Sequence, residues 1–426
     1  MKTKSPAQSQ PTIAFLHYTA APVIGGVEAV IQAQAGLFLQ HGYQVSVIAG
    51  RGAAEALPAG AEFRLIPELD SQHAGVVQIS SELEHGDVPE VFEVLTADLV
   101  NTLRPILRCF DHVMIHNVFT KHFNLPLTVA LHQLLSEGVI QHGLAWCHDF
   151  TWTSPHSRSK VRPGYPWDLL RTMRRDVTYV VVSQQRQFEL AELFNCPPDM
   201  IQVIYNGVDP DVLWGLSAEG RTLIDRLDVS DSDLILLMPV RVTQAKNIEY
   251  ALHVMSALKL SGCRACLIIT GPPDPHDVQS MAYFHSLLRL RTLLRVEREV
   301  HFVFESGPDP EQPYLIDNRQ VAELFRISDA LFMPSLREGF GMPVLEAGLV
   351  GLPVICTEIP AAQEIGGDEV IWFNAKDAPE SVAGLIRAWA RRSARHQLRR
   401  RVRQNYTWSA IFQHTIEPIL MNRRPT

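Results

Sequence analysis

The sequence predicts two α/β domains, each built around a mostly parallel, doubly wound sheet, and three observations carry this prediction. At 426 residues the chain exceeds the size at which a single hydrophobic core usually stops growing. From Ile13 onward, short apolar runs alternate with longer segments of helical period, as in sheets that carry helices on both faces. A second series of the same kind begins at Leu234, so we expect two domains of about 200 residues each.

The strands expected in the first half are short apolar runs that end at polar or turn residues. They cover Thr12 to His17, Gln44 to Ala49, His112 to His116, Leu144 to Cys147, Thr178 to Val182 and Gln202 to Tyr205. Helical periodicity is expected between them at Val27 to Gln40, Val88 to Cys109, Asn124 to Ser136 and Gln184 to Phe194. Because strands and helices alternate, the strands should run parallel.

The second half repeats this alternation. Strands are expected at Leu234 to Pro239, Cys266 to Thr270, His301 to Phe304, Ala330 to Met333, Pro353 to Cys356 and Val370 to Phe373. Helices are expected at Ile248 to Leu260, His276 to Leu294, Arg319 to Ile327 and Pro343 to Val350. The hinge should lie between Asn206 and Asp231, a span rich in turn residues and charges, so we place the domains at 1–215 and 216–405.

The composition excludes several classes of protein. A net charge of −8 gives no overall attraction to nucleic acid or to an anionic membrane. The segment from Met1 to Gln10 is polar, and the apolar run from Ile13 to Leu16 is too short for a signal peptide or a spanning helix. We therefore expect a cytoplasmic protein without a transmembrane segment and without a nucleic-acid partner.

The cysteines show neither a disulfide framework nor a metal site. They stand at Cys109, Cys147, Cys196, Cys263, Cys266 and Cys356, a usage typical of a reducing compartment. Cys263 and Cys266 form a close pair, but no second pair completes a zinc site. We interpret them as buried structural thiols and expect no bound metal.

The stretch from Arg337 to Ala347 has the pattern of a ligand-binding turn. A buried strand ends at Pro334, and a helix with proline in its first turn follows the loop. Two carboxylates, Glu338 and Glu346, are separated by seven residues. The unpaired N–H groups of a helix start favour a phosphate or a polar sugar edge, and Glu346 could accept hydrogen bonds from neighbouring hydroxyls. The alternative is an ordinary turn with surface glutamates.

Two cations follow the first strand of the second half. Arg241 and Lys246 lie five positions apart on a loop that enters the next helix. Together they could neutralise a diphosphate and take up the charge that develops when it departs. The alternative is a pair of solvated surface cations.

The first strand is followed by a loop that contains Gly25 and Gly26. This loop is not the three-glycine dinucleotide fingerprint, so a nicotinamide or flavin cofactor has little support. Its backbone could instead pack against a sugar or a phosphate, or it could form a simple turn.

Polar residues also follow the third and fourth strands. His148 and Asp149 follow the fourth, and His116, Asn117 and Lys121 the third. No nucleophilic serine motif accompanies the histidines, so we favour a binding role over proton transfer. Because ligands bind at the carboxyl ends of parallel strands, these residues could face an acceptor.

Two basic stretches need separate interpretations. The stretch from Arg158 to Arg175 could bind an anionic acceptor, but a solvated loop is the simpler explanation. The run from Arg387 to Arg403 holds eight arginines and no acidic residue. It could touch anionic lipid at the membrane surface. We favour a solvated helix, because nothing apolar anchors it.

Together these motifs resemble the retaining nucleotide-sugar glycosyltransferases of group 1, a family with the GT-B fold. The resemblance rests on Glu338 to Ala347, Arg241 with Lys246, Asn206 to Asp209, Gly25 to Glu28 and Tyr406 to Trp408, in the family's order. It implies two Rossmann-like domains that face each other across a cleft. It also implies that the last helix, within residues 406–426, crosses back onto the N-terminal domain.

The resemblance implies roles for individual residues. Catalytic roles would fall to Glu338, His148, Arg241 and Lys246, and the acceptor side would comprise Gly25, His116, Asn117, Lys121 and Asp149. The donor would contact Gly26, Arg241, Lys246, Glu338, Gly339, Phe340, Gly341 and Glu346. No metal or other cofactor is implied.

The expected activity is the transfer of a hexose, glucose or mannose, from a UDP-, GDP- or ADP-sugar with retention of configuration. The acceptor would be a hydroxyl of a small polar molecule, including an anionic one, or of a glycan. Two alternatives stay open. One is a sugar-nucleotide epimerase or a phosphorylase of the same fold, and the other is a sugar-nucleotide-binding protein without turnover.

Overall fold

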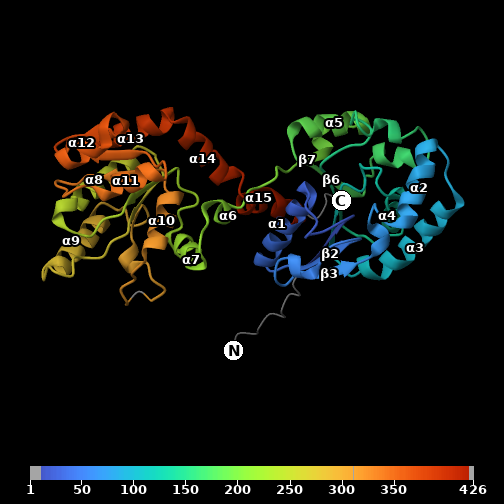
Figure 1. Ribbon diagram of the computed structural model, residues 1–426, viewed down its shortest axis with the longest axis horizontal. Helices are drawn as coiled ribbons and strands as arrows, with labels where there is room; N and C mark the ends of the chain where they lie inside the picture. The colour runs from blue at the N-terminus through green and yellow to red at the C-terminus, as the bar shows by residue number, and fades with distance from the viewer. Residues whose placement is uncertain (1–10, 310, 422–426) are drawn as a thin grey trace. The chain divides into compact units, whose positions relative to one another are not determined.

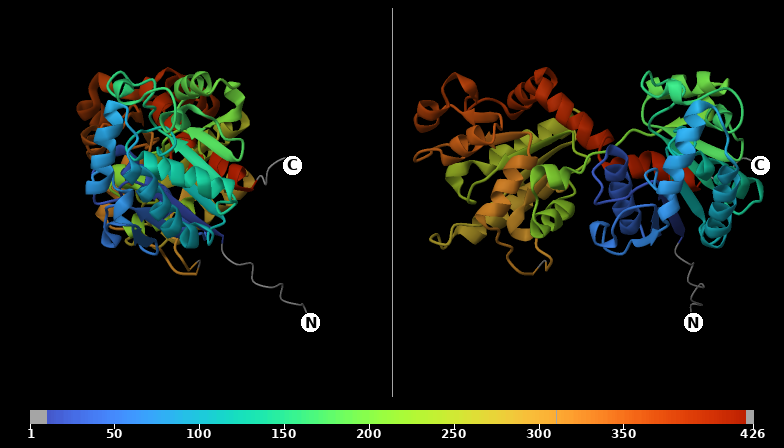
Figure 2. Two further views of the ribbon diagram at one scale, coloured as in Figure 1. Left: turned by 90° about the vertical axis from the view of Figure 1, so that its right-hand side faces the viewer. Right: turned by 45° about the vertical axis from the view of Figure 1, so that its right-hand side comes forward.

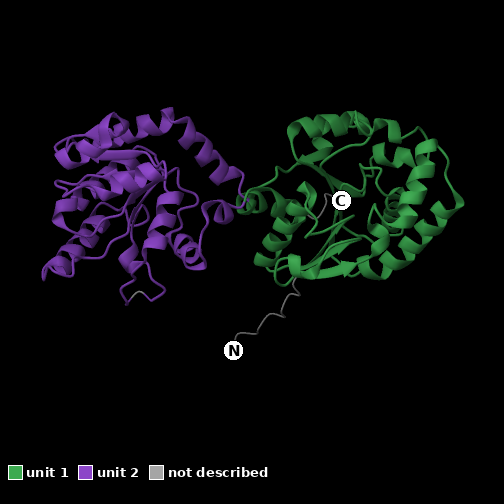
Figure 3. Ribbon diagram, in the orientation of Figure 1, with its two compact units in different colours: residues 1–208, 408–426 green, residues 209–407 purple. Residues whose placement is uncertain are grey.

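The computed structural model describes residues 11–309 and 311–421. The chain divides into two compact units, residues 1–208 with 408–426 (unit 1) and residues 209–407 (unit 2), coloured separately in Figure 3. The boundaries expected from the sequence, after residues 215 and 405, fall close to these junctions. Both units consist of a sheet covered by helices (Figure 1).

Unit 1 contains a seven-stranded sheet whose neighbouring strands are all parallel. The strands are β1 (Thr12–His17), β2 (Gln44–Ala49), β3 (Glu62–Leu65), β4 (His112–His116), β5 (Gly143–Cys147), β6 (Val177–Val181) and β7 (Ile201–Val203), in the order β3-β2-β1-β4-β5-β6-β7. The edge strand β3 is absent from the sequence prediction. Its residues alternate between charged and apolar and none is fully buried, so it lacks the continuous apolar run of the inner strands.

The helices of unit 1 cover both faces of this sheet. They are α1 (Gly26–Gln40), α2 (Ala74–His85), α3 (Glu90–Leu107), α4 (Leu125–Ser136) and α5 (Gln184–Phe194). Alternate side chains of β1 point to opposite faces of the sheet. Phe15 packs with α1, while Leu16 packs with α3 and α4. Helix α2 is a further element that the sequence prediction missed, although Val76, Ile79 and Leu83 bury one of its faces.

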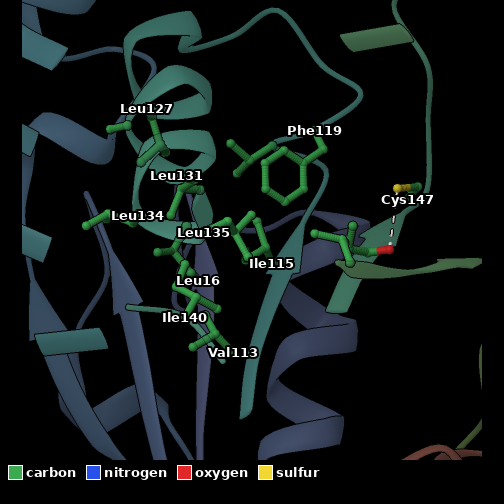
Figure 4. Packing of buried hydrophobic residues seen from close by; sticks show 14 of the residues in the cluster. Leu16, Val113, Ile115, Phe119, Leu127, Leu131, Leu134, Leu135, Ile140 and Cys147 are labelled. Atoms are coloured by element: carbon green, nitrogen blue, oxygen red, sulfur yellow. Dashed lines mark hydrogen bonds between the residues drawn. The ribbon is translucent and has the colours of Figure 1, made fainter. Parts of the chain in front are cut away.

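Figure 4 shows the core between α4 and the sheet. Leu127, Leu131 and Leu134 on α4 belong to one buried cluster with Val113 and Ile115 on β4, and each of these side chains is at most 1% exposed. Burying such side chains contributes about 1.5–3 kcal/mol apiece, so this packing fixes the position of β4 and of the loop that follows it.

Unit 2 contains a second parallel sheet of six strands. The strands are β8 (Leu234–Met238), β9 (Ala265–Ile269), β10 (Val300–Phe302), β11 (Ala330–Met333), β12 (Val354–Thr357) and β13 (Ile371–Phe373), in the order β10-β9-β8-β11-β12-β13. The helices are α6 (Pro210–Trp214), α7 (Ala218–Leu227), α8 (Ile248–Leu260), α9 (Ser280–Leu293), α10 (Asn318–Ile327), α11 (Met342–Leu349), α12 (Pro360–Gly366), α13 (Pro379–Arg392) and α14 (Ala394–Asn405).

Helices also cover both faces of the second sheet, as the right-hand view of Figure 2 shows. Leu236 on β8 packs with α8 and α13, while Leu237 packs with α7, α10 and α11. The predicted fold class is therefore confirmed for each unit: both are Rossmann-like α/β domains with a doubly wound parallel sheet.

After unit 2 the chain returns to unit 1. Helix α15 (Trp408–Ile411), a π-helical turn (Phe412–Ile416) and α16 (Glu417–Met421) add Trp408 and Phe412 to the core around α1. The Phe412 ring lies 5.2 Å from the Phe38 ring and stacks on His41 at 3.9 Å.

The interpretation of the run from Arg387 to Arg403 as one solvated helix is wrong. The run is split at Ser393 between α13 and α14. Arg403 is 6% exposed, because its guanidinium binds the buried Asp329 with nitrogen–oxygen distances of 3.2 and 3.1 Å. The acidic partner is missing from the run itself and lies directly before β11, so the local sequence could not show it.

Candidate functional site

In unit 2, a glycine loop connects β11 to helix α11. The chain leaves the buried strand through Ser335, which is 0% exposed, and reaches Glu338. Gly341 caps α11 with a φ of 98°, in the left-handed region that favours glycine, and Pro343 lies in the first turn. The strand, glycine loop and helix start predicted from the sequence are confirmed.

Lys246 and Glu338 form a bidentate ion pair at the carboxyl end of the second sheet. Lys246 Nζ donates to Glu338 Oε1 at 2.6 Å and to Oε2 at 2.7 Å. The Glu338 side chain is 7% exposed and that of Lys246 20%. Because β8 and β11 are neighbours in the sheet, these residues meet although they lie 92 positions apart. A backbone bond of 2.9 Å from Leu336 N to Ala245 O ties the two loops together.

Arg241 keeps its guanidinium accessible. Its side chain is 59% exposed, and Nη1 lies 3.9 Å from Asp274 Oδ1. The loop that carries Arg241 lies close to the loop after β9, where a Cβ on Gly271 would be 2.4 Å from Val240 O. Glycine at this position therefore allows the two loops to touch, and the arginine can still bind an anion.

The remaining residues of the expected donor set in unit 2 lie around the start of α11. The Phe340 side chain is 52% exposed, Glu346 is exposed one turn into the helix, and a Cβ on Gly339 would meet no atom within 4 Å. The helix N-terminus, the two cations and these open groups suit a ligand that combines an anionic part with hydroxyls.

In unit 1, three histidines end three neighbouring strands. His17 ends β1, His116 ends β4 and His148 follows β5. His17 Nδ1 lies 2.9 Å from the carbonyl oxygen of His116, to which it must donate. His116 Nδ1 lies 3.3 Å from His148 Nε2. Sequence reasoning did not assign His17 to the site, although it ends its strand as His116 does.

Asn117 holds the loops after β4 and β5 together. Its φ of 61° lies in the left-handed region. Its side-chain oxygen accepts hydrogen bonds from His148 N at 2.8 Å and Asp149 N at 3.3 Å, and its carbonyl accepts from Lys121 N at 2.9 Å. The acceptor-side residues expected after β4 and β5 are thus brought together, with Asn117 as the scaffold.

Burial keeps His116 and His148 neutral. Desolvation and the nearby His17 lower the pKa of His148 to about 4. Desolvation, helped by His148 and His17, lowers the pKa of His116 well below its ordinary value. At neutral pH these rings are therefore hydrogen-bonding groups without charge.

Gly25 and Gly26 lie at the N-terminus of α1. Gly25 is the N-cap, and the carboxylate of Glu28 folds back against it, so that a Cβ on Gly25 would lie 2.1 Å from Glu28 Oε2. Thr19 Oγ1 donates a hydrogen bond to the same carboxylate. A Cβ on Gly26 would meet nothing within 4 Å, which leaves its backbone open.

The basic stretch from Arg158 to Arg175 forms contacts within unit 1. Arg158 and Arg171 both lie over the Trp152 ring, at 4.4 and 4.1 Å from its centroid. Arg174 pairs with Asp176 at 2.7 Å. These cations therefore pack against unit 1 itself. Sequence reasoning also missed that Asp149 is paired: its Oδ1 lies 3.1 Å from Nη2 of Arg186 on α5.

Residues 11–309 and 311–421 contain neither a cluster of metal-binding side chains nor a membrane-spanning helix. No group of three or more His, Cys, Asp or Glu side chains there could hold a metal ion. Within the same residues, no helix is both long and apolar enough to cross a membrane.

Comparisons with protein families match both halves of the chain. Residues 24–212 match the model of Glycosyltransferase Family 4, and residues 221–405 match that of Glycosyl transferases group 1. An uncharacterized glycosyltransferase of Methanocaldococcus jannaschii is 29% identical over 250 residues, which cover 56% of this chain and 58% of the relative. The mannosylglucosylglycerate synthase of Petrotoga mobilis is 22% identical over 66% of this chain and 67% of its own.

One further relative and one solved structure also match the chain. D-inositol 3-phosphate glycosyltransferase of Stackebrandtia nassauensis is 25% identical over 54% of this chain and 50% of its own. Thus the chain spans between half and two thirds of the length of these relatives. The sucrose-phosphate synthase of Thermosynechococcus elongatus matches 96% of this chain and 98% of its own with a TM-score of 0.38 and 14% identity.

Proposed function

Because the chain belongs to the group 1 glycosyltransferases, we propose that it transfers a hexose from a nucleotide-diphosphate sugar to an acceptor hydroxyl with retention of configuration. The acceptor is a small polar molecule or a glycan, and the sugar is glucose or mannose. The reaction needs no bound metal and takes place in the cytoplasm. The observation that carries the proposal is the Lys246–Glu338 ion pair beside the start of α11.

In unit 2, the cations and the helix start suit the donor. Arg241 and Lys246 bind the diphosphate and stabilise the charge that develops when it leaves. Glu338 orients the ammonium of Lys246 and contacts the transferred sugar. Glu346 accepts hydrogen bonds from the ribose, and the open backbone at Gly339 approaches the phosphates.

In unit 1, neutral histidines suit the polar face of a sugar. His148 is the hydrogen-bonding group nearest to the reaction, with His116 behind it. The leaving diphosphate oxygen takes the acceptor proton on the face where the acceptor attacks, so no protein base is required. The contribution of the protein is then orientation and charge stabilisation.

The named activities of the relatives support a hexosyl transfer. They include a mannosylglucosylglycerate synthase, a D-inositol 3-phosphate glycosyltransferase and O-antigen mannosyltransferases.

The test combines donor screening with two variants. Thermal shift against UDP-, GDP- and ADP-sugars identifies the donor, and mass spectrometry with a panel of acceptors detects the product. Glu338→Ala and Lys246→Ala should each lower kcat by about 10²- to 10³-fold or more. Lys246→Ala removes a positive charge that stabilises the leaving diphosphate in the transition state, and Glu338→Ala removes the carboxylate that orients it. The one-bond carbon–proton coupling at C1 of the product, measured by NMR, checks retention for either sugar.

Lys259→Ala is the matched control, since this lysine also forms an ion pair, with Glu299 at 2.9 Å, on the exposed end of α8. Its turnover should equal that of the wild type. Unchanged turnover in both site variants would contradict the proposal. Donor stabilisation without product for any acceptor would favour a binding protein, and conversion of the donor alone would favour an epimerase.

A further inference from the structure

Lys121 is a buried lysine on a firmly held loop. It is 9% exposed and belongs to the loop between β4 and α4. Its backbone N–H donates to Asn117 O at 2.9 Å. Its neighbours on either side bind Thr151: Thr151 N donates to Thr120 O at 2.9 Å, and His122 N donates to Thr151 Oγ1 at 3.1 Å. The position of the lysine is therefore set by the fold.

The ammonium of Lys121 has an aromatic neighbour and no paired anion. Its Nζ lies 4.8 Å from the centroid of the Phe123 ring. Among the residues that the structure describes, no carboxylate lies within 4.0 Å of Nζ. The carboxylate of Asp149, which acts on Lys121 through space, is held by Arg186 at 3.1 Å.

The titratable groups around Lys121 do not balance its charge. Burial lowers the pKa of His122 and of His148 to about 4, so both rings are neutral at pH 7. Lys160, which also faces His122, is paired with Glu84 at 3.0 Å. Arg186 is shared between Asp149 and Glu189. A desolvated ammonium without an anion is unfavourable, and a bound anion would remove that cost.

We propose that Lys121 binds a carboxylate or phosphate group of the acceptor, an inference that rests on the proposed function and names its acceptor class. Asn117 connects Lys121 to His148, the residue proposed to lie near the reaction. Its carbonyl oxygen accepts a hydrogen bond from Lys121 N, and its side-chain oxygen accepts one from His148 N. The diphosphate of the donor is assigned to Arg241 and Lys246 in unit 2. The anion bound at Lys121 in unit 1 is therefore a group of the acceptor.

The first test measures binding without turnover. Glycerol 3-phosphate, D-glycerate and glycerol are titrated into the full chain, and the backbone amide shifts of His122 and Phe123 are followed by NMR. We expect shifts with an anionic probe and none with glycerol. Lys121→Met should abolish the shifts, while Lys160→Met, the control on a paired lysine that is 44% exposed, should keep them. Equal shifts in Lys121→Met and wild type, or no shifts in the wild type, would overturn the proposal.

The thermal stability of Lys121→Met separates binding from a structural role. Methionine keeps the length of the aliphatic part of the side chain and removes the unpaired charge, so the free variant should melt no lower than the wild type. A clear fall in Tm would mean that the charge serves the fold and would contradict an anion site.

The second test uses turnover once a donor is known. Lys121→Met should raise KM for anionic acceptors about 10- to 100-fold, the loss typical of one charge-assisted hydrogen bond, and leave the donor KM unchanged. Equal loss with neutral acceptors would contradict the assignment. If no acceptor is glycosylated although the amide shifts persist, the proposed function fails and the anion site stands. The preferred probe, phosphate or carboxylate, identifies the acceptor class.

Discussion

Among individual residues, His116 is one whose surroundings fix which ring nitrogen carries the proton. It is 0% exposed, and its Nε2 has no hydrogen-bond partner among the described residues. An unpaired buried N–H is rarer than an unpaired acceptor, so the proton belongs on Nδ1. His116 Nδ1–H then donates to His148 Nε2, which leaves the proton of His148 on its Nδ1. His148 therefore offers a ligand a donor, and His116 is a positioning residue.

The tautomer can be measured directly. Long-range proton–nitrogen NMR should show His148 of the wild type as the Nδ1–H form at pH 7, and His116→Phe should remove this preference. The variant should also lower kcat about tenfold, because the His148 ring loses its fixed orientation. His253→Phe, at an exposed position of α8, serves as the control. An Nε2–H signal for His148 in the wild type would contradict the argument.

At the level of elements, the segment from β11 to α11 was predictable because its signals are local. A buried apolar run, a proline, two glycines and a second proline each act within a few residues. The pairing of Lys246 with Glu338 could not be predicted, because it depends on β8 and β11 becoming neighbours in the sheet. The burial of Lys121 was equally hidden, because a lysine is expected at the surface unless the fold encloses it.

Two glycines of the same loop should respond differently to alanine. Gly341 has a φ of 98°, and its Cβ would approach Ile365 Cδ1 to 3.3 Å, so Gly341→Ala should lower the free energy of unfolding by about 1–2 kcal/mol. A Cβ added at Gly339 would meet open space, and this residue has no left-handed φ, so Gly339→Ala should change the free energy of unfolding by less than about 0.5 kcal/mol. Denaturant titration measures both, and equal losses would show that the left-handed turn is not the cause.

Across the whole molecule, the chain passes between the units twice, after Val208 and after Thr407. The two passages are joined within unit 1. Trp408 N donates to Val208 O at 3.2 Å, and a Cβ on Gly207 would lie 2.7 Å from the Trp408 ring. Helix α14, which leads to the second passage, is tied to the sheet of unit 2 through Arg403 and Asp329. Asp329 thereby fixes where the last segment leaves unit 2.

This anchor should govern the acid stability of unit 2. Burial acts to raise the pKa of Asp329, but His396 and the Arg403 guanidinium outweigh it and lower the pKa to about 2. The ordinary value is 3.8, so the carboxylate stabilises the fold above about pH 4, and this contribution is lost as the pH falls toward 2. Asp329→Ala leaves Arg403 buried without its anion and should cost about 3–5 kcal/mol at pH 7.

The pH dependence distinguishes this ion pair from simple packing. In urea titrations, the wild type should lose stability between pH 4 and 2 more steeply than Asp329→Asn, which has no carboxylate to protonate. Arg401→Ala, an exposed arginine on the same helix, should follow the wild type at every pH. Parallel curves for the wild type and Asp329→Asn would show that the charge of Asp329 contributes nothing. In that case α14 would be held by its other polar contacts, such as the Arg400–Asp233 ion pair at 2.7 Å and the bond from Arg403 to Ser232 O at 2.8 Å.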